Sequence, residues 1–331
     1  MSEDIILQVE NLVKYFPVKG GLLSSILGRE KRFVHAVDDV SFDIQRRKSL
    51  GLVGESGSGK TTTGRLVLRL LDPTSGRIVF NGKDITHMQD KELIPLRKKM
   101  QVIFQDPMAS LNPYMKIGDA VKDALDIHNI GSPRERRDMV MDMLKKMGLT
   151  PPERIYNSYP KDISGGQRQR VVIARALVLN PEFIVADEAV AMLDVSIRSQ
   201  LIELMIELAE EFGLTYLFIT HDLAVTKYIC DRIAVMYLGK IVEIGPLRDI
   251  FTSPLHPYTR SLMSVIPVPD PFREKEEFIP KGEIPNPISP PSGCRFHPRC
   301  PYAKEVCKTT EPPLRDAGKG HQVACHFAGE V

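Results

Sequence analysis

Residues 54–61 have the sequence Gly54-Glu55-Ser56-Gly57-Ser58-Gly59-Lys60-Thr61. This stretch fits the pattern G-x-x-x-x-G-K-[ST] in full, and its flanks supply the context that the pattern needs. Residues 49–53 are typical of a buried strand, and the residues from Thr62 onward predict a helix that ends at Asp72-Pro73. A glycine-rich turn between a strand and a helix predicts a loop whose backbone N–H groups surround phosphate oxygens.

Within this loop, each polar side chain has an expected task. Lys60 is expected to reach the β- and γ-phosphates of a nucleotide, and the Thr61 hydroxyl is expected to ligate Mg²⁺. The alternative is a glycine-rich turn without a ligand, but the strand and helix at its ends favour the phosphate site. The nucleotide-binding residues predicted here are Gly54, Glu55, Ser56, Gly57, Ser58, Gly59, Lys60, Thr61 and Thr62.

Length and composition set outer limits on what the chain is. Its 331 residues allow one large α/β domain with an appendage, or two domains, and a hydrophobic fraction of 43% suffices for a sizeable core. The net charge of only +2 gives no global field that would favour nucleic acid. Because no uninterrupted apolar run is long enough to cross a bilayer, we expect any membrane association to come through a partner.

Two acids follow a short apolar segment in the second half of the chain. Residues 183–186 predict a buried strand of a parallel sheet, and Asp187-Glu188 comes directly after it. The carboxyl ends of parallel strands share one edge of a sheet with the phosphate loop. We therefore expect Asp187 to hold Mg²⁺ through water and Glu188 to polarise the attacking water.

A second helix opens with Ser164-Gly165-Gly166-Gln167. Ser164 could be an ordinary N-cap, but that alternative does not explain two glycines that leave the helix start bare. Bare N–H groups at a helix N-terminus form an anion site. Because the chain already has one phosphate loop, a second site suggests that a nucleotide of another subunit is held here.

In this order and spacing, the motifs resemble those of the ATP-binding subunits of ABC transporters, over roughly the first 250 residues. The resemblance implies a P-loop NTPase (RecA-like) α/β core with an antiparallel β subdomain and an inserted helical subdomain at about 106–178. It makes 54–61 the Walker A loop, Ser164 to Gln167 the signature motif, and Asp187-Glu188 the Walker B end. The implied domains are an ATP-binding domain over 1–255 and a cysteine-bearing extension over 256–331 with a proline-rich linker.

Further roles follow from the resemblance. Gln105 resembles the Q-loop glutamine that senses Mg²⁺ and the permease, and His221 resembles the histidine that contacts γ-phosphate and orients water. Asp194 resembles the D-loop aspartate that acts at the partner's nucleotide. Phe16 stands where this family stacks adenine, with Tyr15 as the alternative, although core packing explains either ring about as well.

The chain departs from the family pattern in places. Ala189 follows Glu188 where proline is usual, Ala191 and Met192 replace Ser-Ala before Leu193-Asp194, and Ile163 replaces the usual leucine. The lost serine hydroxyl puts part of the hydrogen bonding between subunits in doubt. Because Lys60, Glu188 and His221 remain, we expect a chain that hydrolyses ATP.

Four of the five cysteines cluster near the end, at Cys294, Cys300, Cys307 and Cys325. In a reducing compartment, clustered cysteines indicate a metal more often than disulfides. Four thiolates suit a [4Fe–4S] cluster, which we favour, or Zn²⁺, and His297, His321 and His326 leave mixed zinc ligation open. The surrounding residues resemble the C-terminal extension of oligopeptide/dipeptide importers, some of which carry an iron–sulfur cluster. Cys230 stands apart and is expected in the core.

Together these features predict the ATPase subunit of a peptide importer at the cytoplasmic face of the membrane. The resemblance implies a heterodimer with a second ATPase, two transmembrane permeases and an extracytoplasmic binding protein. We expect the tail to be separate from the phosphate loop, so that ATP binding survives loss of its metal. The alternatives are an oligosaccharide importer, a soluble ABC ATPase acting on nucleic acid, and a degenerate regulatory subunit.

Overall fold

The computed structural model describes residues 4–18, 32–191, 193–266, 280 and 282–330. These residues divide into two compact units, and segments distant in sequence meet in each. The first unit consists mainly of residues 88–219, and the second combines 5–44, 50–87 and the chain from 220 onward. Residues 267–279 of the expected proline-rich linker and Met192 lie outside the described residues.

The first unit contains a parallel sheet that ends in the two expected acids. Strand β7 (Phe183–Asp187) lies between β6 (Met100–Ile103) and β8 (Thr215–Thr220), and both pairings are parallel. Every residue of β7 and β8 is buried, as the continuous apolar runs of a parallel sheet require. Helix α3 (Asp90–Arg97) precedes β6, and α9 (Val195–Phe212) connects β7 to β8 and ends at the left-handed Gly213.

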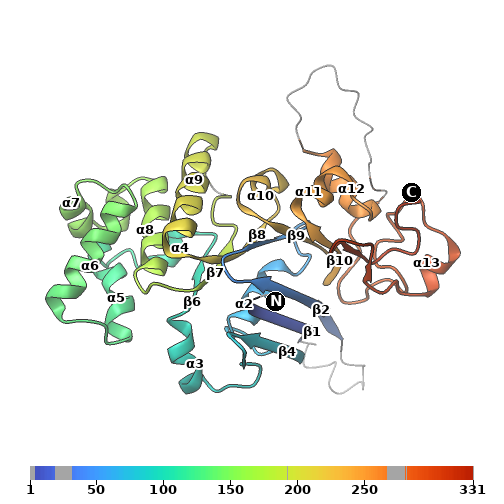
Figure 1. Ribbon diagram of the computed structural model, residues 1–331, viewed down its shortest axis with the longest axis horizontal. Coiled ribbons are helices and arrows are strands. Elements are labelled where there is room, and N and C mark those ends of the chain that lie inside the picture. The colour runs from blue at the N-terminus through green and yellow to red at the C-terminus, as the bar shows by residue number, and fades with distance from the viewer. Residues whose placement is uncertain (1–3, 19–31, 192, 267–279, 281, 331) are drawn as a thin grey trace, which may run out of the picture. The chain divides into compact units, whose positions relative to one another are not determined.

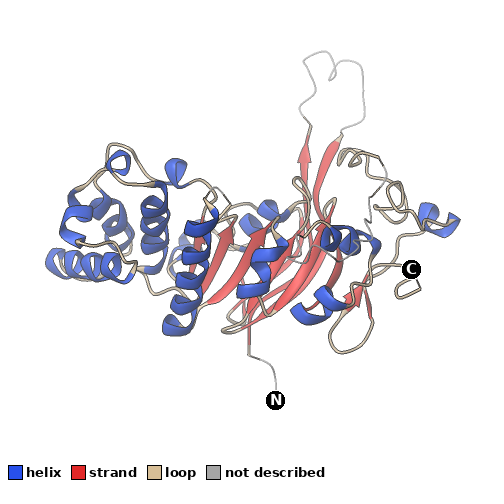
Figure 2. Cartoon of the chain, turned by 90° about the horizontal axis from the view of Figure 1, so that it is seen from above, coloured by secondary structure: helices blue, strands red, loops and turns tan. Residues whose placement is uncertain are grey.

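Between β6 and β7 every regular element is a helix, which fits the expected helical subdomain. Figures 1 and 2 show α5 to α8 gathered into one bundle without strands. Helix α6 starts at a capping box, in which Ser132 and Glu135 bond each other's backbone N–H groups. The bundle comprises α4 (Pro107–Ser110), α5 (Ile117–Ile127), α6 (Pro133–Lys146), α7 (Pro152–Asn157), the 3₁₀ turn Pro160–Asp162 and α8 (Gly165–Leu177).

The second unit contains the antiparallel subdomain and the phosphate loop. One sheet has the order β2-β1-β4-β5, with β1 (Ile5–Pro17) antiparallel to β4 (Ser75–Phe80). Its other strands are β2 (Phe33–Gln45) and β5 (Lys83–Asp84). The loop lies between β3 (Ser49–Val53) and α2 (Lys60–Val67), so the predicted strand–loop–helix arrangement is present.

In this unit, paired strands in the order β3-β9-β10-β12-β11 join the phosphate-loop strand to the C-terminal tail. Strand β3 pairs in parallel with β9 (Arg232–Tyr237), and β9 forms a hairpin with β10 (Lys240–Pro246) around Leu238 and Gly239. Strand β10 then pairs with β12 (Gln322–Val323), and β12 pairs with β11 (Arg315–Asp316). The remaining helices are α10 (Leu223–Ile229), α11 (Leu247–Thr252), α12 (Pro257–Ser264) and α13 (Glu305–Thr309).

The tail shares a hydrophobic core with the ATP-binding part of the second unit. Val53 of β3, Tyr237 of β9 and Ile250 of α11 are buried in the same cluster as Tyr258 and Phe296 of the tail. We expected the tail to be separate from the phosphate loop, and the structure shows that this was wrong. The proline-rich stretch between them suggested a linker, but the aromatic residues on either side of that stretch pack into one core.

Candidate functional site

The phosphate loop depends on two glycines that touch neighbouring backbone. A Cβ atom on Gly54, at φ 151°, would lie 2.1 Å from the carbonyl oxygen of Met236, and one on Gly59, at φ 107°, would lie 2.2 Å from that of Ala36. Both positions therefore exclude side chains. Gly57 is different, because its φ of 79° favours glycine while the space around it is open.

Lys60 places its charge inside the loop. Its side chain is buried, and Nζ donates hydrogen bonds to the carbonyl oxygens of Gly54 at 2.8 Å and Glu55 at 2.9 Å. Helix α2 starts at Lys60, after the N-cap Gly59, which has no side chain to cover the helix start. The lysine charge and the positive end of the helix dipole thus act at the same place, as an anion site requires.

The structure separates the two candidates for adenine stacking. The Tyr15 hydroxyl donates to Asp38 at 2.6 Å, and its ring lies 4.2 Å from that of His35. Burial and the bond to Asp38 raise the pKa of Tyr15 to about 12. Tyr15 is thus held by Asp38 and His35. Phe16 is half-buried, as Tyr15 is, and the ammonium of Lys14 lies 5.1 Å from its ring centre.

The first unit brings Gln105 and Glu188 together. Nε2 of Gln105, between β6 and α4, donates to Oε2 of Glu188 at 2.8 Å. Glu188 follows β7 in a left-handed conformation at φ 48°, and its N–H donates to the carbonyl of Ile219 at 2.9 Å. A non-glycine residue held at positive φ is a form of backbone strain that gathers at active sites. Asp187, the last residue of β7, is buried.

The signature residues include a complete capping box. The Ser164 hydroxyl accepts from the N–H of Gln167 at 3.3 Å, and the Gln167 side chain accepts from the N–H of Ser164 at 3.0 Å. The two glycines differ: a Cβ on Gly166 would lie 2.9 Å from Cγ2 of Ile197, but one on Gly165 would meet only Arg168, at 3.9 Å. Packing within the subunit explains Gly166, and it leaves Gly165 without an explanation.

The other motif residues lie at ends of elements. Asp194 is the N-cap residue of α9, and its carbonyl accepts from the N–H of Arg198. Ala189 is buried, so the position where proline is usual belongs to the core. His221 follows β8 and is exposed, and Asp222 beside it caps α10 by accepting from Ala224 N–H at 3.0 Å.

Predicted site residues are thus distributed over both compact units. Gln105, Asp187, Glu188, the signature residues and Asp194 belong to the first unit, and the phosphate loop, Phe16 and His221 belong to the second. Within the first unit the structure joins Gln105 to Glu188 directly. Within the second it joins Lys60 to the loop that it serves.

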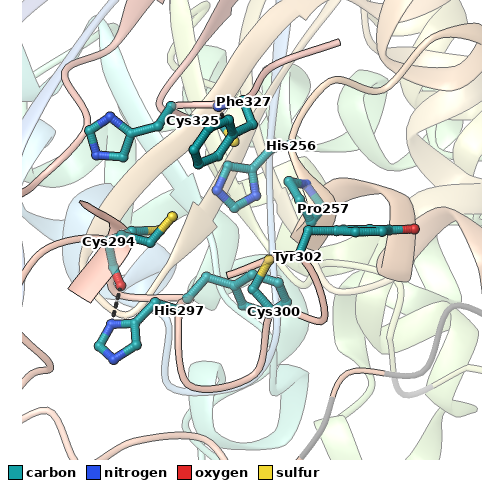
Figure 3. A pocket seen from close by; sticks show the side chains of 11 residues that line it. His256, Pro257, Cys294, His297, Cys300, Tyr302, Cys325 and Phe327 are labelled. Atoms are coloured by element: carbon teal, nitrogen blue, oxygen red, sulfur yellow. Dashed lines mark hydrogen bonds between the residues drawn. The ribbon is translucent and has the colours of Figure 1, made fainter. Parts of the chain in front are cut away.

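The four tail cysteines line a single pocket. Cys294, Cys300, Cys307 and Cys325 surround it together with Phe296 and Phe327, and Figure 3 shows the sulfur atoms of Cys294 and Cys300 turned toward its interior. Burial raises the pKa of Cys294 to about 12, so this thiol is neutral at physiological pH when no cation is near. In the described part of the chain, no group of three or more His, Cys, Asp or Glu side chains is placed to hold a single metal ion.

The tail histidines have other partners. Nδ1 of His297 lies 3.0 Å from the carbonyl oxygen of Cys294, and Figure 3 marks this contact with a dashed line. Nε2 of His326 lies 2.9 Å from the carbonyl oxygen of Thr310, and Nε2 of His321 lies 2.7 Å from Oε1 of the buried Glu243. Each contact uses one ring nitrogen, and His297 and His326 also line the pocket, so mixed zinc ligation stays an alternative. Cys230 is buried beside Gly51, as expected.

Sequence reasoning missed two residues that touch the phosphate loop. Tyr258 of α12 accepts a hydrogen bond from the N–H of Glu55, and the guanidinium of Arg299 bonds both carboxylate oxygens of Glu55. The pattern G-x-x-x-x-G-K-[ST] leaves position 55 unspecified, so it carries no signal for partners of Glu55.

Comparison with known families gives two matches. A family model described as "ABC transporter" matches residues 37–191, and one described as "Oligopeptide/dipeptide transporter, C-terminal region" matches residues 242–307. The second match spans α12 and the first three tail cysteines. In the described residues, no helix combines the length and apolar character needed to span a membrane.

Curated relatives are similar over nearly the whole chain. The oligopeptide transport ATP-binding protein AppF of Bacillus subtilis is 47% identical over 98% of both chains. A putative peptide import ATP-binding protein of Brucella ovis is 49% identical, again over 98% of both. Both names refer to ATP binding and peptide transport, and neither refers to an iron–sulfur cluster.

Solved structures resemble the chain over about three quarters of its length. The ATP-binding cassette MJ0796, in a dimeric post-hydrolysis state bound to ADP and Pi, has a TM-score of 0.62 and 30% identity over 73% of this chain and 99% of that one. CbiO1 from Clostridium perfringens, part of an ABC transporter complex, has a TM-score of 0.63 and 29% identity over 76% of this chain and 92% of that one.

Proposed function

Since the chain belongs to the ATP-binding subunits of oligopeptide-importing ABC transporters, we propose a role in ATP hydrolysis for each residue of its site. It is the ATPase subunit of a peptide importer, and the relatives' names favour peptides over oligosaccharides as the cargo. The observation that carries the proposal is the phosphate loop, in which Lys60 is buried at the start of α2 and held by the loop's own carbonyls.

Binding of the phosphates and of adenine is assigned to residues of the second unit. The loop N–H groups and Lys60 surround the β- and γ-phosphates, and Phe16 stacks on adenine because Tyr15 is engaged with Asp38. Thr61, Gln105 and Asp187 are the residues that would hold Mg²⁺. The ion neutralises charge on the transferred phosphoryl group when bound.

Hydrolysis is assigned to Glu188. Gln105 orients the carboxylate of Glu188, and His221 orients the attacking water. Glu188 accepts the hydrogen bond of Gln105, which fixes the direction of its carboxylate. A carboxylate fixed in this way polarises the attacking water and takes up its proton. His221 orients that water against the γ-phosphate. Ala189 and Ala191 change the surroundings of these reacting side chains, but Glu188 and His221 themselves are retained.

The signature residues act on the nucleotide of a second, homologous ATPase. Gly165 supports this, because among the described residues a Cβ at this position would meet only Arg168, at 3.9 Å. Ser164, Gly166 and Gln167 shape the same helix start, and Asp194 lies at the start of α9. We assign the subunit to a heterodimer on two membrane permeases at the cytoplasmic face, served by an extracytoplasmic binding protein.

For the tail we propose a [4Fe–4S] cluster held by Cys294, Cys300, Cys307 and Cys325. Four thiols that line one pocket provide the donor set that such a cluster uses. A four-iron cluster is larger than one ion, so its ligands need not converge on a single point as they would on Zn²⁺. The proposal rests on the four thiols that line the pocket, with Zn²⁺ as the alternative, and the role of the metal is structural.

The hydrolysis proposal is tested with Glu188→Gln in the assembled transporter. Glutamine keeps the shape of the side chain and loses the charge that polarises water, so ATP binding persists while turnover falls by at least about a hundredfold. Hydrolysis and nucleotide retention are measured on the same preparation. Wild-type-like turnover would remove Glu188 from the mechanism.

Metal analysis of anaerobically purified protein tests the cluster proposal. Brown protein with about four irons per chain is expected, because thiolate-to-iron charge transfer absorbs visible light. Replacing any one of the four tail cysteines with serine should bleach the protein, and Cys230→Ser is the matched control that should not. If the analysis finds one zinc and no iron per chain, the site binds zinc and not a cluster. If it finds neither zinc nor iron, the proposal that the tail binds metal is wrong.

A further inference from the structure

The C-terminal tail contacts the phosphate loop at Glu55. Nη1 and Nη2 of Arg299 donate to the two carboxylate oxygens of Glu55, at 2.8 and 3.1 Å. The N–H of Glu55 donates to the hydroxyl oxygen of Tyr258 at 2.8 Å. Both the backbone and the side chain of Glu55 are thus held by residues more than 200 positions later in the chain.

Buried aromatic rings fix both of these partners. Tyr237, Tyr258 and Phe296 are at most 1% exposed, and their ring centres lie 4.6 to 5.4 Å apart. The guanidinium carbon of Arg299 lies 5.9 Å from the ring centres of Tyr237 and of Phe296. A side chain surrounded in this way cannot follow Glu55 if the loop moves, so it holds the loop in place.

Charge gives this contact a direct consequence for ATP. Glu55 puts a negative charge into a loop that must receive a triphosphate, and an unpaired carboxylate there would repel it. The bidentate pair with Arg299 neutralises that charge, and Arg299 is only 8% exposed, so solvent screens the pair weakly.

The same tail segment lines the four-cysteine pocket. Arg299 directly precedes Cys300, and Phe296 both lines that pocket and packs on Tyr258. The segment is wound tightly: the N–H of His297 donates to the carbonyl of Cys294 at 2.9 Å, and that of Cys300 to Phe296 at 3.0 Å. An opening of the pocket at Cys294 or Cys300 would therefore displace Arg299.

We propose that Arg299 is a positioning residue for the phosphate loop: it clamps and neutralises Glu55, and so makes ATP affinity depend on the closed four-cysteine pocket. The inference rests on the proposed function of residues 54–61 as the ATP site. It assigns the tail a part in nucleotide binding besides its part in the core.

The experiment measures the Kd of a fluorescent ATP analogue for the full-length isolated subunit, with thermal unfolding of each variant alongside. Arg299→Met removes the ion pair and leaves Glu55 charged, so Kd should rise about tenfold. Adding Glu55→Gln to that variant removes the repulsion, so Kd should return to within about threefold of wild type. Glu311→Gln is the control. It removes another ion pair of the tail, between Glu311 and Lys240 of β10, and it does not change the contacts of Glu55.

The rescue separates positioning from mere support of the fold. An unchanged Kd in Arg299→Met, or a weakened Kd that Glu55→Gln does not restore, would overturn the proposal. If Arg299→Met does not fold, Arg299→Lys takes its place, with a smaller rise in Kd that Glu55→Gln must again reverse. A wild-type subunit that binds no ATP analogue would contradict the proposed function itself, before any variant is compared.

Discussion

Adjacent glycines at the start of α8 have different reasons to be glycine. Gly166 lies against Ile197 of α9, so a side chain there would push two helices apart. Of the described residues, a Cβ on Gly165 would meet only Arg168, at 3.9 Å, so a side chain there costs the isolated subunit little. We propose that the nucleotide of a partner approaches this helix start and needs the room that Gly165 leaves.

We therefore expect Gly165→Leu to leave nucleotide binding and thermal stability of the isolated subunit close to wild type. In the assembled transporter the same change should lower ATP turnover by at least about tenfold, because the leucine would occupy the space of the partner's phosphate. Gly166→Ala is the comparison, and it should lower the free energy of unfolding by about 1–3 kcal/mol through overpacking against Ile197. Equal losses of isolated-subunit ATP affinity in Gly165→Leu and Lys60→Ala would contradict action in trans.

Single residues also mark how far sequence reasoning reaches. Lys60 and Glu188 were predicted because a motif fixes their spacing from neighbours and the chemistry demands their types. Tyr258 and Arg299 could not be predicted, because they meet Glu55 from 203 and 244 positions away. The contact depends on how the tail folds back, and no local pattern encodes that path.

Among the secondary-structure elements, those with local signals were predicted well. The buried strands expected at residues 49–53 and 183–186 are present as β3 and β7, because each depends on residues a few positions apart. Strands β11 and β12 have two residues each, too few for an alternating pattern to show. Their existence depends on the edge of β10, so sequence reasoning had no means of finding them.

Helix α12 carries a titratable cap that links stability to pH. Nδ1 of its N-cap residue, His256, accepts from the backbone N–H of Tyr258 at 3.0 Å. The backbone N–H of His256 donates to the Glu243 carboxylate at 2.9 Å. Burial lowers the pKa of His256 to about 4, although the charge of Glu243 opposes that shift. The folded protein therefore holds this imidazole neutral at pH values where the unfolded chain protonates it.

A depressed pKa makes the folded state lose stability as the pH falls from about 6.5 toward 4. Between pH 7 and pH 5 we expect His256 to account for a loss of about 2 kcal/mol in the free energy of unfolding. His256→Asn keeps an oxygen that can cap α12 and removes the titration, so the loss should be smaller in this variant. Urea unfolding at pH 7 and pH 5 measures the free energy of unfolding of the wild type and of His256→Asn. If this free energy has the same pH dependence in both proteins, His256 does not have the role stated here.

On the scale of the whole molecule, the ATP-binding part and the tail of the second unit depend on each other. Tyr258 and Phe296 cover Tyr237 and Ile250, which would otherwise be open to water. The domain boundary that the sequence suggested near residue 255 therefore passes through a shared core. Motifs give the order of functional parts along the chain, but they do not say which parts share a core.

A chain ended at residue 255 should consequently fold poorly, although it keeps every ATP motif. Losing the contacts of Tyr258 and Phe296 should cost several kcal/mol, since removing one large buried aromatic side chain costs about 3–5 kcal/mol. The soluble fraction and the thermal midpoint, compared with those of the full chain, measure this. A truncated protein as soluble and as stable as the full chain would show that the core does not need the tail.

The pairing of β10 with β12 also has a consequence for biosynthesis. Glu243 pairs with Val323 and Ile244 with Gln322, so one edge of β10 gains its partner from residues that are made about 80 positions later. A ribosome encloses the residues that it has added most recently, so until residues 322–323 emerge, that edge presents open hydrogen-bonding groups to any neighbouring nascent chain. Completion of this sheet therefore waits for residues 322–323, and chaperone protection of the nascent subunit matters most in that interval.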